Sequence, residues 1–270
     1  MTRAQTPKYL DRTTPPHLST LILLAGLSAL AMNIFLPSLP GMTAHFNTEY
    51  RLIQLSVALY LGVNAALQLL MGPISDRWGR RPVILWGLGL FLVATLGCIF
   101  APNVTVFLTF RMVQASVVVA MVLSRAIVRD MVPQDRAASM IGYVTMGMAV
   151  VPMIGPAFGG QLDEAFGWQA NFWALFVLGA ALFVVCWRDL GETAPLSGRT
   201  LMQQFRDYPA LLTSRRFWGY ALAAGLSSGA FFAYLGGAPF VGDRVFGLPP
   251  STLGLLFGAP AIGDFLGNFA

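Results

Sequence analysis

The sequence predicts an all-α, polytopic membrane protein. Hydrophobic residues make up 56% of the 270 residues and charged residues only 11%, with a mean hydropathy of +0.66. Soluble domains carry about 25% charged residues, so this composition excludes an ordinary soluble protein. Apolar runs of about 20 residues, each long enough to cross a ~30 Å hydrocarbon core, recur along the chain. We expect eight transmembrane helices, at residues 18–36, 52–71, 83–101, 104–128, 137–162, 170–187, 217–240 and 252–270.

The basic residues predict the topology. The formal net charge is +5, but the basic residues stand singly between apolar runs and form no patch that would bind nucleic acid. With the N-terminus in the cytoplasm, 13 of the 17 Lys and Arg residues fall in cytoplasmic segments and only two, Arg51 and Arg244, in outer loops. The remaining two, Arg111 and Arg125, lie within the fourth span. This bias follows the positive-inside rule and predicts a cytoplasmic N-terminus.

The order of polar and apolar segments predicts four regions. Residue 270 falls inside the eighth apolar run with no polar flank after it, so we expect the second bundle to be incomplete. The regions are a disordered cytoplasmic tail at 1–17, a six-helix bundle at 18–188, a cytoplasmic linker at 189–216 and the first two helices of a second bundle at 217–270.

A charged connection between the second and third spans carries the first motif, Gly72-Pro-Ile-Ser-Asp76-Arg77-Trp-Gly79-Arg80-Arg81. Glycines allow a close turn, and an aspartate there can pair with an arginine or cap the next helix. This spacing resembles the signature loop of the major facilitator superfamily of secondary transporters. An ordinary cytoplasmic loop would explain the arginines but not the glycines and the aspartate in register. The resemblance implies a cytoplasmic gating loop, which we extend to Arg125 and Arg129 at the end of the fourth span.

Two further motifs resemble the same family. In the fourth span, Arg111-Met-Val-Gln114-Ala115 is similar to its R-x-x-q-G motif, with alanine in place of glycine. In the fifth span, Gly142 and Val151-Pro152-Met-Ile-Gly155-Pro156-Ala-Phe-Gly159-Gly160 are similar to the motif of proton-driven drug antiporters, with Val151 in place of a glycine. The alternative for these glycines is close helix packing, and both interpretations can hold.

The segments Asn33-Ile-Phe-Leu-Pro-Ser-Leu-Pro40, Ser124-Arg125-Ala-Ile-Val-Arg129-Asp130 and Leu190-Gly191-Glu192-Thr193 resemble the Bcr/CflA branch of drug-resistance exporters. The resemblance implies a major facilitator fold in the bacterial inner membrane. It also implies efflux of small amphipathic drugs by a monomer that uses alternating access and the proton gradient, without a cofactor. The branch commonly has an aspartate where this chain has Asn33. Neutral or weakly anionic substrates are therefore favoured over cationic ones.

Polar residues inside the spans are candidates for the substrate and proton pathway. Tyr60, Asn64 and Gln68 recur every four residues, which predicts a polar stripe facing the bundle interior or a hydrogen-bonded seam between helices. Arg111 and Gln114 share a face of the fourth span. A buried arginine costs about 2.5–3.5 kcal/mol on insertion scales, so Arg111 requires a polar cavity or partner.

Two more charged residues complete the predicted set. We expect Arg125 to be structural, reaching toward the cytoplasm and pairing with Asp76. Among the 12 acidic residues, only Asp264 lies well inside an apolar run. We interpret it as the proton carrier, with Arg111 as the fixed charge. The alternative is a hydrogen bond in helix packing beside Gly263 and Gly267.

Other function classes remain as alternatives or are excluded. A nutrient or metabolite symporter and a non-transporting membrane remnant or scaffold are both compatible with these motifs. No enzyme is expected, because no span or loop holds a catalytic set of His, Asp and Ser or of paired carboxylates. Cys98 and Cys186 lie in apolar runs without metal-ligand or disulfide spacing, so no metal site is expected.

Overall fold

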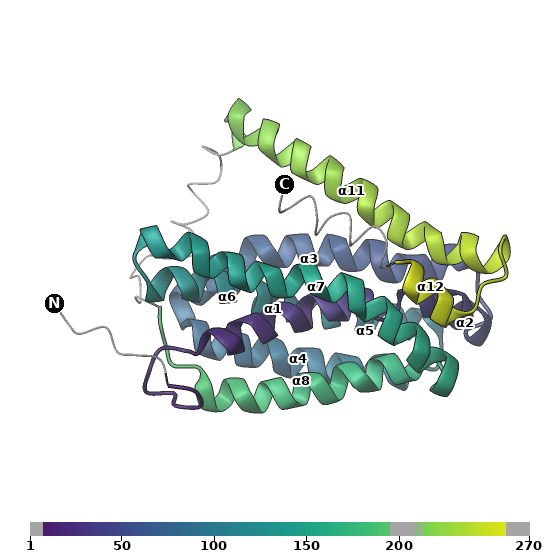
Figure 1. Ribbon diagram of the computed structural model, residues 1–270, viewed down its shortest axis with the longest axis horizontal. Helices are drawn as coiled ribbons and strands as arrows, with labels where there is room; N and C mark the ends of the chain where they lie inside the picture. The colour runs from purple at the N-terminus through teal and green to yellow at the C-terminus, as the bar shows by residue number, and fades with distance from the viewer. Residues whose placement is uncertain (1–7, 195–208, 210–211, 258–270) are drawn as a thin grey trace.

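The computed structural model describes residues 8–194, 209 and 212–257, and every regular element in that part of the chain is a helix. Long helices run side by side along the longest axis of the molecule (Figure 1). The α-helices are α1 (Leu18–Asn33), α2 (Leu39–His45), α3 (Tyr50–Trp78), α4 (Arg80–Ile99), α5 (Val104–Gln114), α6 (Val118–Met131), α7 (Gln134–Phe166), α8 (Gln169–Asp189), α11 (Arg215–Arg244) and α12 (Pro250–Leu256), with 3₁₀ turns η1 (Leu36–Ser38) and η2 (Ala115–Val117).

Seven helical stretches within the described residues are long and apolar enough to cross a membrane, which confirms the all-α membrane fold and seven of the eight predicted spans. The first stretch, Leu18–His45, joins α1, η1 and α2, and the fourth, Val104–Met131, joins α5, η2 and α6. The eighth predicted span begins in α12, and most of it lies outside the described residues.

The two irregular spans change helix type for different reasons. In the first span, Pro37 stands at the start of η1, a position where its missing N–H removes no helical hydrogen bond. In the fourth span, η2 follows directly after Gln114, so the R-x-x-q-G-like motif ends on a change from α to 3₁₀ geometry. Short 3₁₀ stretches inside a span often mark strained or functional positions.

The core of the six-span unit, α1 to α8, is apolar and aromatic. Phe107 and Phe172 stack edge to face with centroids 5.6 Å apart, and Phe172 lies 5.8 Å from Phe35. Both cysteines are free thiols buried in this core. Helix α1 lies at the centre of this core, in contact with α6, α7 and α8.

Glycines of α7 allow two close helix contacts. A Cβ on Gly155 would lie 3.1 Å from Leu30 Cδ1, and one on Gly159 would overlap the carbonyl oxygen of Ile34. On an adjacent face of α7, a Cβ on Gly160 would overlap the carbonyl oxygen of Pro250 in α12. The predicted packing role of this motif is therefore present in the structure, as expected for small residues that let backbones approach.

The prediction of a disordered tail is wrong for residues 8–17. This segment folds back beneath the start of α1 and beside the end of α8 (Figure 1), where Leu10 and His17 donate backbone hydrogen bonds to Asp189. His17 Nδ1 also caps α1 by accepting from the Ser19 N–H at 3.3 Å. The polar composition hid this docking, because the contacts are made by the backbone and not by apolar side chains.

A substitution in α7 tests the close contact with α1. Gly159→Ala should lower the free energy of unfolding by about 1–3 kcal/mol, because the new methyl group must displace the α1 backbone. Gly142→Ala is the matched control, since nothing lies within 4 Å of its Cβ position. Unfolding by SDS in mixed micelles measures both variants. Equal stabilities would contradict the contact.

Candidate functional site

A single arginine lies at the centre of the six-span unit. Arg111 of α5 is fully buried, and its Nη2 donates to the carbonyl oxygen of Ala31 in α1 at 2.9 Å. Its Nε donates to the Ser56 carbonyl of α3 at 3.4 Å, and its Nη1 donates to Gln114 Oε1. One side chain thus joins three helices through neutral oxygen acceptors.

Two aromatic rings lie next to the same guanidinium. The Arg111 Cζ is 4.3 Å from the centroid of Phe35 and 4.0 Å from that of Tyr60. Aromatic faces attract a cation through their quadrupole, most strongly where water is absent. Among the described residues, no carboxylate pairs with Arg111, so its positive charge is solvated only by dipoles and rings. The predicted requirement for a polar partner is met by these groups.

Gln114 extends the network into α4. Its Nε2 donates to Thr95 Oγ1 at 2.8 Å, and the Thr95 hydroxyl donates to the Phe91 carbonyl at 2.6 Å. Both Gln114 and Thr95 are fully buried. The chain of hydrogen bonds therefore crosses from α1 through α5 to α4. The sequence analysis placed Arg111 and Gln114 on one face of their span, and the two side chains are hydrogen-bonded to each other.

Three polar atoms in this region have no hydrogen-bond partner among the described residues: Tyr60 OH, Ser56 Oγ and Asn33 Oδ1. Asn33 is buried at the end of α1, where its Nδ2 donates to the Ala29 carbonyl at 2.7 Å. Buried polar atoms are nearly always paired, so free ones mark a place for water or a ligand. The region around Arg111 thus has unused hydrogen-bonding capacity.

The predicted polar stripe of α3 divides into two environments. Tyr60 is fully buried beside Arg111 and Asn64 is buried, whereas Gln68 is exposed. Gln68 Nε2 donates to Asn64 Oδ1 at 2.6 Å, a bond that stays within α3. The stripe therefore leads from the surface of the six-span unit to the Arg111 network. Of its three residues, Tyr60 is the one whose ring contacts the Arg111 guanidinium of α5.

The 72–81 connection forms an ion-paired cluster at the end of the bundle that also carries residues 8–17, here called the basic end. Arg80 Nη1 lies 2.6 Å from Asp76 Oδ1, and Arg80 Nε lies 3.1 Å from Asp130 Oδ2 of α6. Arg80 also donates to Ser75 Oγ. Helices α3, α4 and α6 meet through one guanidinium, and the gating role of this cluster stays a prediction.

Two details of this connection differ from the prediction. The turn consists of Gly79 alone, whose φ of 95° favours glycine, while Gly72 lies inside α3 with nothing within 4 Å of its Cβ position. Arg125 does not pair with Asp76, because Arg80, the first residue of α4 after the Gly79 turn, lies 2.6 Å from that carboxylate and occupies it. Arg125 instead reaches Met148 Sδ of α7 at 3.3 Å, and Arg77 and Arg129 are exposed.

Glu192 has a role that the sequence analysis missed. Its Oε1 accepts from the Arg80 N–H at 2.7 Å and its Oε2 from the Arg81 N–H at 3.2 Å, so it caps the N-terminus of α4. A Cβ on Gly79 would overlap this carboxylate, which is a second reason for glycine there. The signal was present in the Leu190-Gly191-Glu192-Thr193 motif, but the partner lies 112 residues away.

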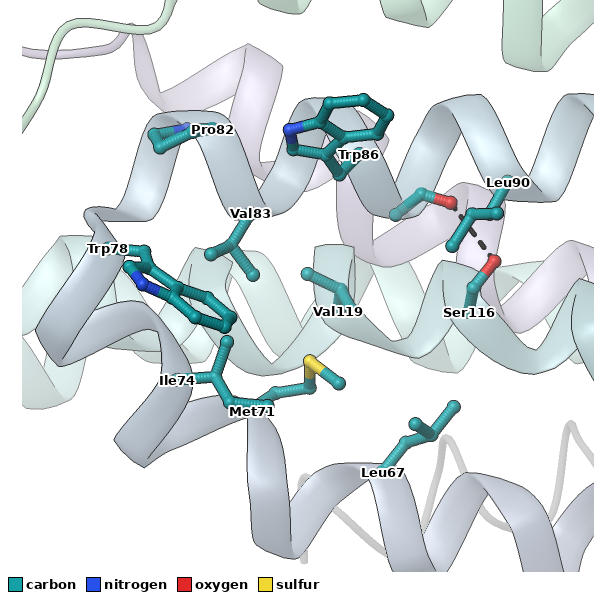
Figure 2. A pocket seen from close by; sticks show the side chains of 11 residues that line it. Leu67, Met71, Ile74, Trp78, Pro82, Val83, Trp86, Leu90, Ser116 and Val119 are labelled. Carbon is teal, nitrogen blue, oxygen red and sulfur yellow. Dashed lines mark hydrogen bonds between the residues drawn. The ribbon is translucent and has the colours of Figure 1, made fainter. Parts of the chain in front are cut away.

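A groove on the outside of the six-span unit is apolar. It has a volume of about 490 Å³ between α3, α4 and α6, and the indoles of Trp78 and Trp86 border it (Figure 2). Their exposed fractions are 61% and 75%, and Ser116 donates its hydroxyl hydrogen to the Gly87 carbonyl at its far end (Figure 2). The groove contains no charged side chain, so it is distinct from the polar site around Arg111.

The remaining predicted residue, Asp264, lies outside the described residues, so its role stays a prediction. Within the described ranges, no three His, Cys, Asp or Glu side chains are grouped as metal ligands would be.

Comparison with known proteins finds a family model and several relatives that match this chain. The family model described as Major Facilitator Superfamily matches residues 21–270. An uncharacterized MFS-type transporter of Bacillus subtilis is 34% identical over 253 residues, 92% of this chain and 63% of that protein. A chloramphenicol resistance protein of Pseudomonas aeruginosa is 34% identical over 239 residues, covering 87% of this chain and 56% of that protein. Multidrug resistance protein D of Escherichia coli is 32% identical over 251 residues, covering 92% and 63%.

Solved structures share the fold. A bacterial homologue of the human lysosomal transporter Spinster matches with a TM-score of 0.72 and 20% identity, covering 93% of this chain and 60% of that one. A D-xylose-proton symporter matches with a TM-score of 0.66 and 16% identity, covering 91% and 65%. The chain spans less than two thirds of the length of these relatives.

Substituting Glu192 tests the cap on α4. Glu192→Gln keeps one oxygen acceptor but removes the charge that faces the helix N-terminus, and should lower the free energy of unfolding by about 0.5–2 kcal/mol. Glu49→Gln is the matched control, because Glu49 precedes α3 but makes no side-chain cap. SDS unfolding of both variants in mixed micelles gives the comparison. Equal stability of the two variants would show that the Glu192 cap contributes nothing to the free energy of unfolding.

Proposed function

We propose a function on one premise: the chain belongs to the major facilitator superfamily. The protein exports small amphipathic, drug-like compounds across the bacterial inner membrane by alternating access, and the proton gradient drives the export. The names of relatives support this class, since they include a chloramphenicol resistance protein and a multidrug resistance protein. Relatives and neighbours with an activity in their names are transporters or resistance proteins, which agrees with the expectation that the chain is no enzyme.

The observation that carries the proposal is the buried charge of Arg111. A cation that is solvated only by carbonyls, Gln114 and two rings will bind an anionic or strongly dipolar group more tightly than water would allow. The free Tyr60 hydroxyl beside it supplies a hydrogen bond for such a group. This arrangement suits a ligand with an apolar body and a polar tip.

The charge around the site also favours a class of substrate. Asn33 is neutral, and Arg111 has no carboxylate partner among the described residues, so the local field repels cations. Neutral and weakly anionic compounds avoid this repulsion. We therefore infer that a neutral phenicol is a better probe than a permanently cationic dye.

Orientation and coupling complete the proposal. The basic end of the bundle faces the cytoplasm, because 13 of 17 basic residues fall in the segments on that side of the predicted topology. Asp264 carries the coupling proton, since it is the one acidic residue well inside an apolar run. Its charge would alternate during the cycle while that of Arg111 stays fixed.

A symporter is the second candidate, because one structural neighbour is a D-xylose-proton symporter. The direction of transport separates the two. An exporter accumulates substrate on the side of the membrane opposite the basic end, whereas a symporter accumulates it on the same side. A non-transporting scaffold would move neither substrate nor protons.

The first functional test removes the charge of Arg111. Arg111→Gln should reduce chloramphenicol transport in proteoliposomes with an imposed pH gradient by at least about tenfold, which corresponds to the loss of about 1.4 kcal/mol of binding or coupling energy. Arg51→Gln, an exposed arginine outside the core, should transport normally. Both proteins must elute as single species in detergent. Full transport by Arg111→Gln would reject the proposed site.

The second test concerns coupling. Asp264→Asn should still bind substrate but lose the dependence of its transport on the pH gradient, because an amide cannot exchange the proton. Counterflow at equal pH on both sides measures substrate binding and exchange without net proton movement. An Asp264→Asn protein whose transport keeps the pH dependence of the unmodified protein would remove this residue from the mechanism.

A further inference from the structure

Residues 8–17, here called the N-terminal strap, are held on the end of α8 by a buried carboxylate. Asp189 is fully buried. Its Oδ1 accepts the Leu10 N–H at 2.7 Å, and its Oδ2 accepts the His17 N–H at 3.1 Å. Leu10 has a φ of 62°, a backbone conformation that residues other than glycine rarely adopt. The carboxylate thus fixes the strap near both of its ends.

The middle of the strap lies directly on Gly191. A Cβ at that position would be 2.6 Å from the Thr14 carbonyl oxygen and 3.0 Å from that of Arg12. Within the strap, Asp11 Oδ1 accepts from the Thr13 N–H at 3.0 Å and from the Thr13 hydroxyl at 2.6 Å, which lowers the pKa of Asp11. The strap is therefore held both by Asp189 and by hydrogen bonds of its own.

This element forms one wall of a hollow at the basic end. The hollow has a volume of about 350 Å³ and is lined by Leu10, Asp11, Arg12 and Thr13 of the strap and by Trp187 and Arg188 of α8. Neither Arg12 nor Arg188 has a carboxylate partner in the described part of the chain.

The charge of the hollow is positive on balance. Lys8 is close enough to contribute to the lowered pKa of Asp11. Asp11 and the buried Asp189 have their oxygens directed at hydroxyl and backbone donors. Two guanidiniums therefore remain to bind an anion.

An apolar groove lies further along α8. It has a volume of about 380 Å³ and runs between α1 and α8 past Ile22, Leu182, Val185 and Leu178, with Val151 of α7 also in its lining. Arg188 follows Val185 by three residues, so both lie on one face of α8. Ten residues separate Arg188 from Leu178, a rise of about 15 Å, which matches half of a ~30 Å hydrocarbon core. A charged hollow above an apolar groove of one leaflet's depth fits an amphipathic ligand.

We propose that this surface binds an anionic phospholipid, with the phosphate between Arg12 and Arg188 and one acyl chain in the groove between α1 and α8. Trp187, 51% exposed at the end of its span, lies at the depth where indoles border lipid headgroups. Guanidinium groups pair with phosphate oxygens through two parallel hydrogen bonds. The site requires only that the helices span a membrane, so it does not depend on the transported substrate.

The test measures thermal stabilisation of the purified protein in detergent by added lipid. Phosphatidylglycerol should stabilise it at lower concentration than phosphatidylcholine with identical chains. Arg12→Gln and Arg188→Gln should each raise the phosphatidylglycerol concentration for half-maximal stabilisation by about fivefold, the effect of one basic residue near a charged surface. Arg77→Gln is the matched control, because Arg77 is an exposed arginine of the same end that lies on α3, away from the strap.

A variant that spares both arginines tests the role of the strap. Asp189→Asn replaces one acceptor oxygen with an amide that faces a backbone N–H, so it should loosen the strap and weaken the response to phosphatidylglycerol as the arginine variants do. The prediction for Arg12→Gln and Arg188→Gln stands even if Asp189→Asn fails to fold.

Several outcomes would overturn the proposal. Equal stabilisation by both lipids would do so, as would unchanged responses of the two arginine variants. Stabilisation by glycerol phosphate alone at the same concentrations would instead identify a free-phosphate site. A response to single-stranded nucleic acid that exceeds the response to phosphatidylglycerol would identify a polyanion surface.

Discussion

The buried guanidinium of Arg111 constrains the whole six-span unit. Transferring such a charge from water is unfavourable unless its hydrogen bonds are replaced, and here the replacements come from Ala31, Ser56 and Gln114. These groups belong to α1, α3 and α5, so tilting any one of these helices alone would leave part of the charge unsolvated. The helices must therefore move together, or a ligand must take the place of a lost partner. The Arg111 network therefore couples the positions of α1, α3 and α5.

At the basic end, the last residue of α8 and the three residues after it hold two distant parts of the chain, the N-terminal strap and the start of α4. Asp189 binds the N-terminal strap, Gly191 makes room for the strap backbone, and Glu192 caps α4. Both carboxylates accept backbone N–H groups, which leaves arginine side chains such as Arg80 free to pair across α3, α4 and α6. The end of α8 therefore sets where α1 and α4 begin relative to each other.

The sequence predicted the features that depend on local composition. Seven spans, the fold class, the interior position of Tyr60 and the close packing around Gly159 follow from hydropathy, helical period and side-chain size. The errors concern pairings between distant residues. Leu10 and Asp189 are 179 residues apart, and no local pattern indicates that a polar tail will dock there. The predicted pair between Arg125 and Asp76 is also wrong. Asp76 pairs instead with Arg80, which is only four residues away in the sequence.

The glycines of α7 show how one helix can serve two contacts. Gly159 faces the α1 backbone inside the six-span unit, and the next residue, Gly160, faces the α12 backbone outside it. Gly254 of α12 returns the contact against the Pro156 carbonyl. Small residues such as glycine let helix backbones approach closely and pack through van der Waals contact. The α1 contact is backed by the aromatic core around Phe35 and Phe172. Glycine at two successive positions therefore lets the one helix α7 bring its backbone against both α1 and α12.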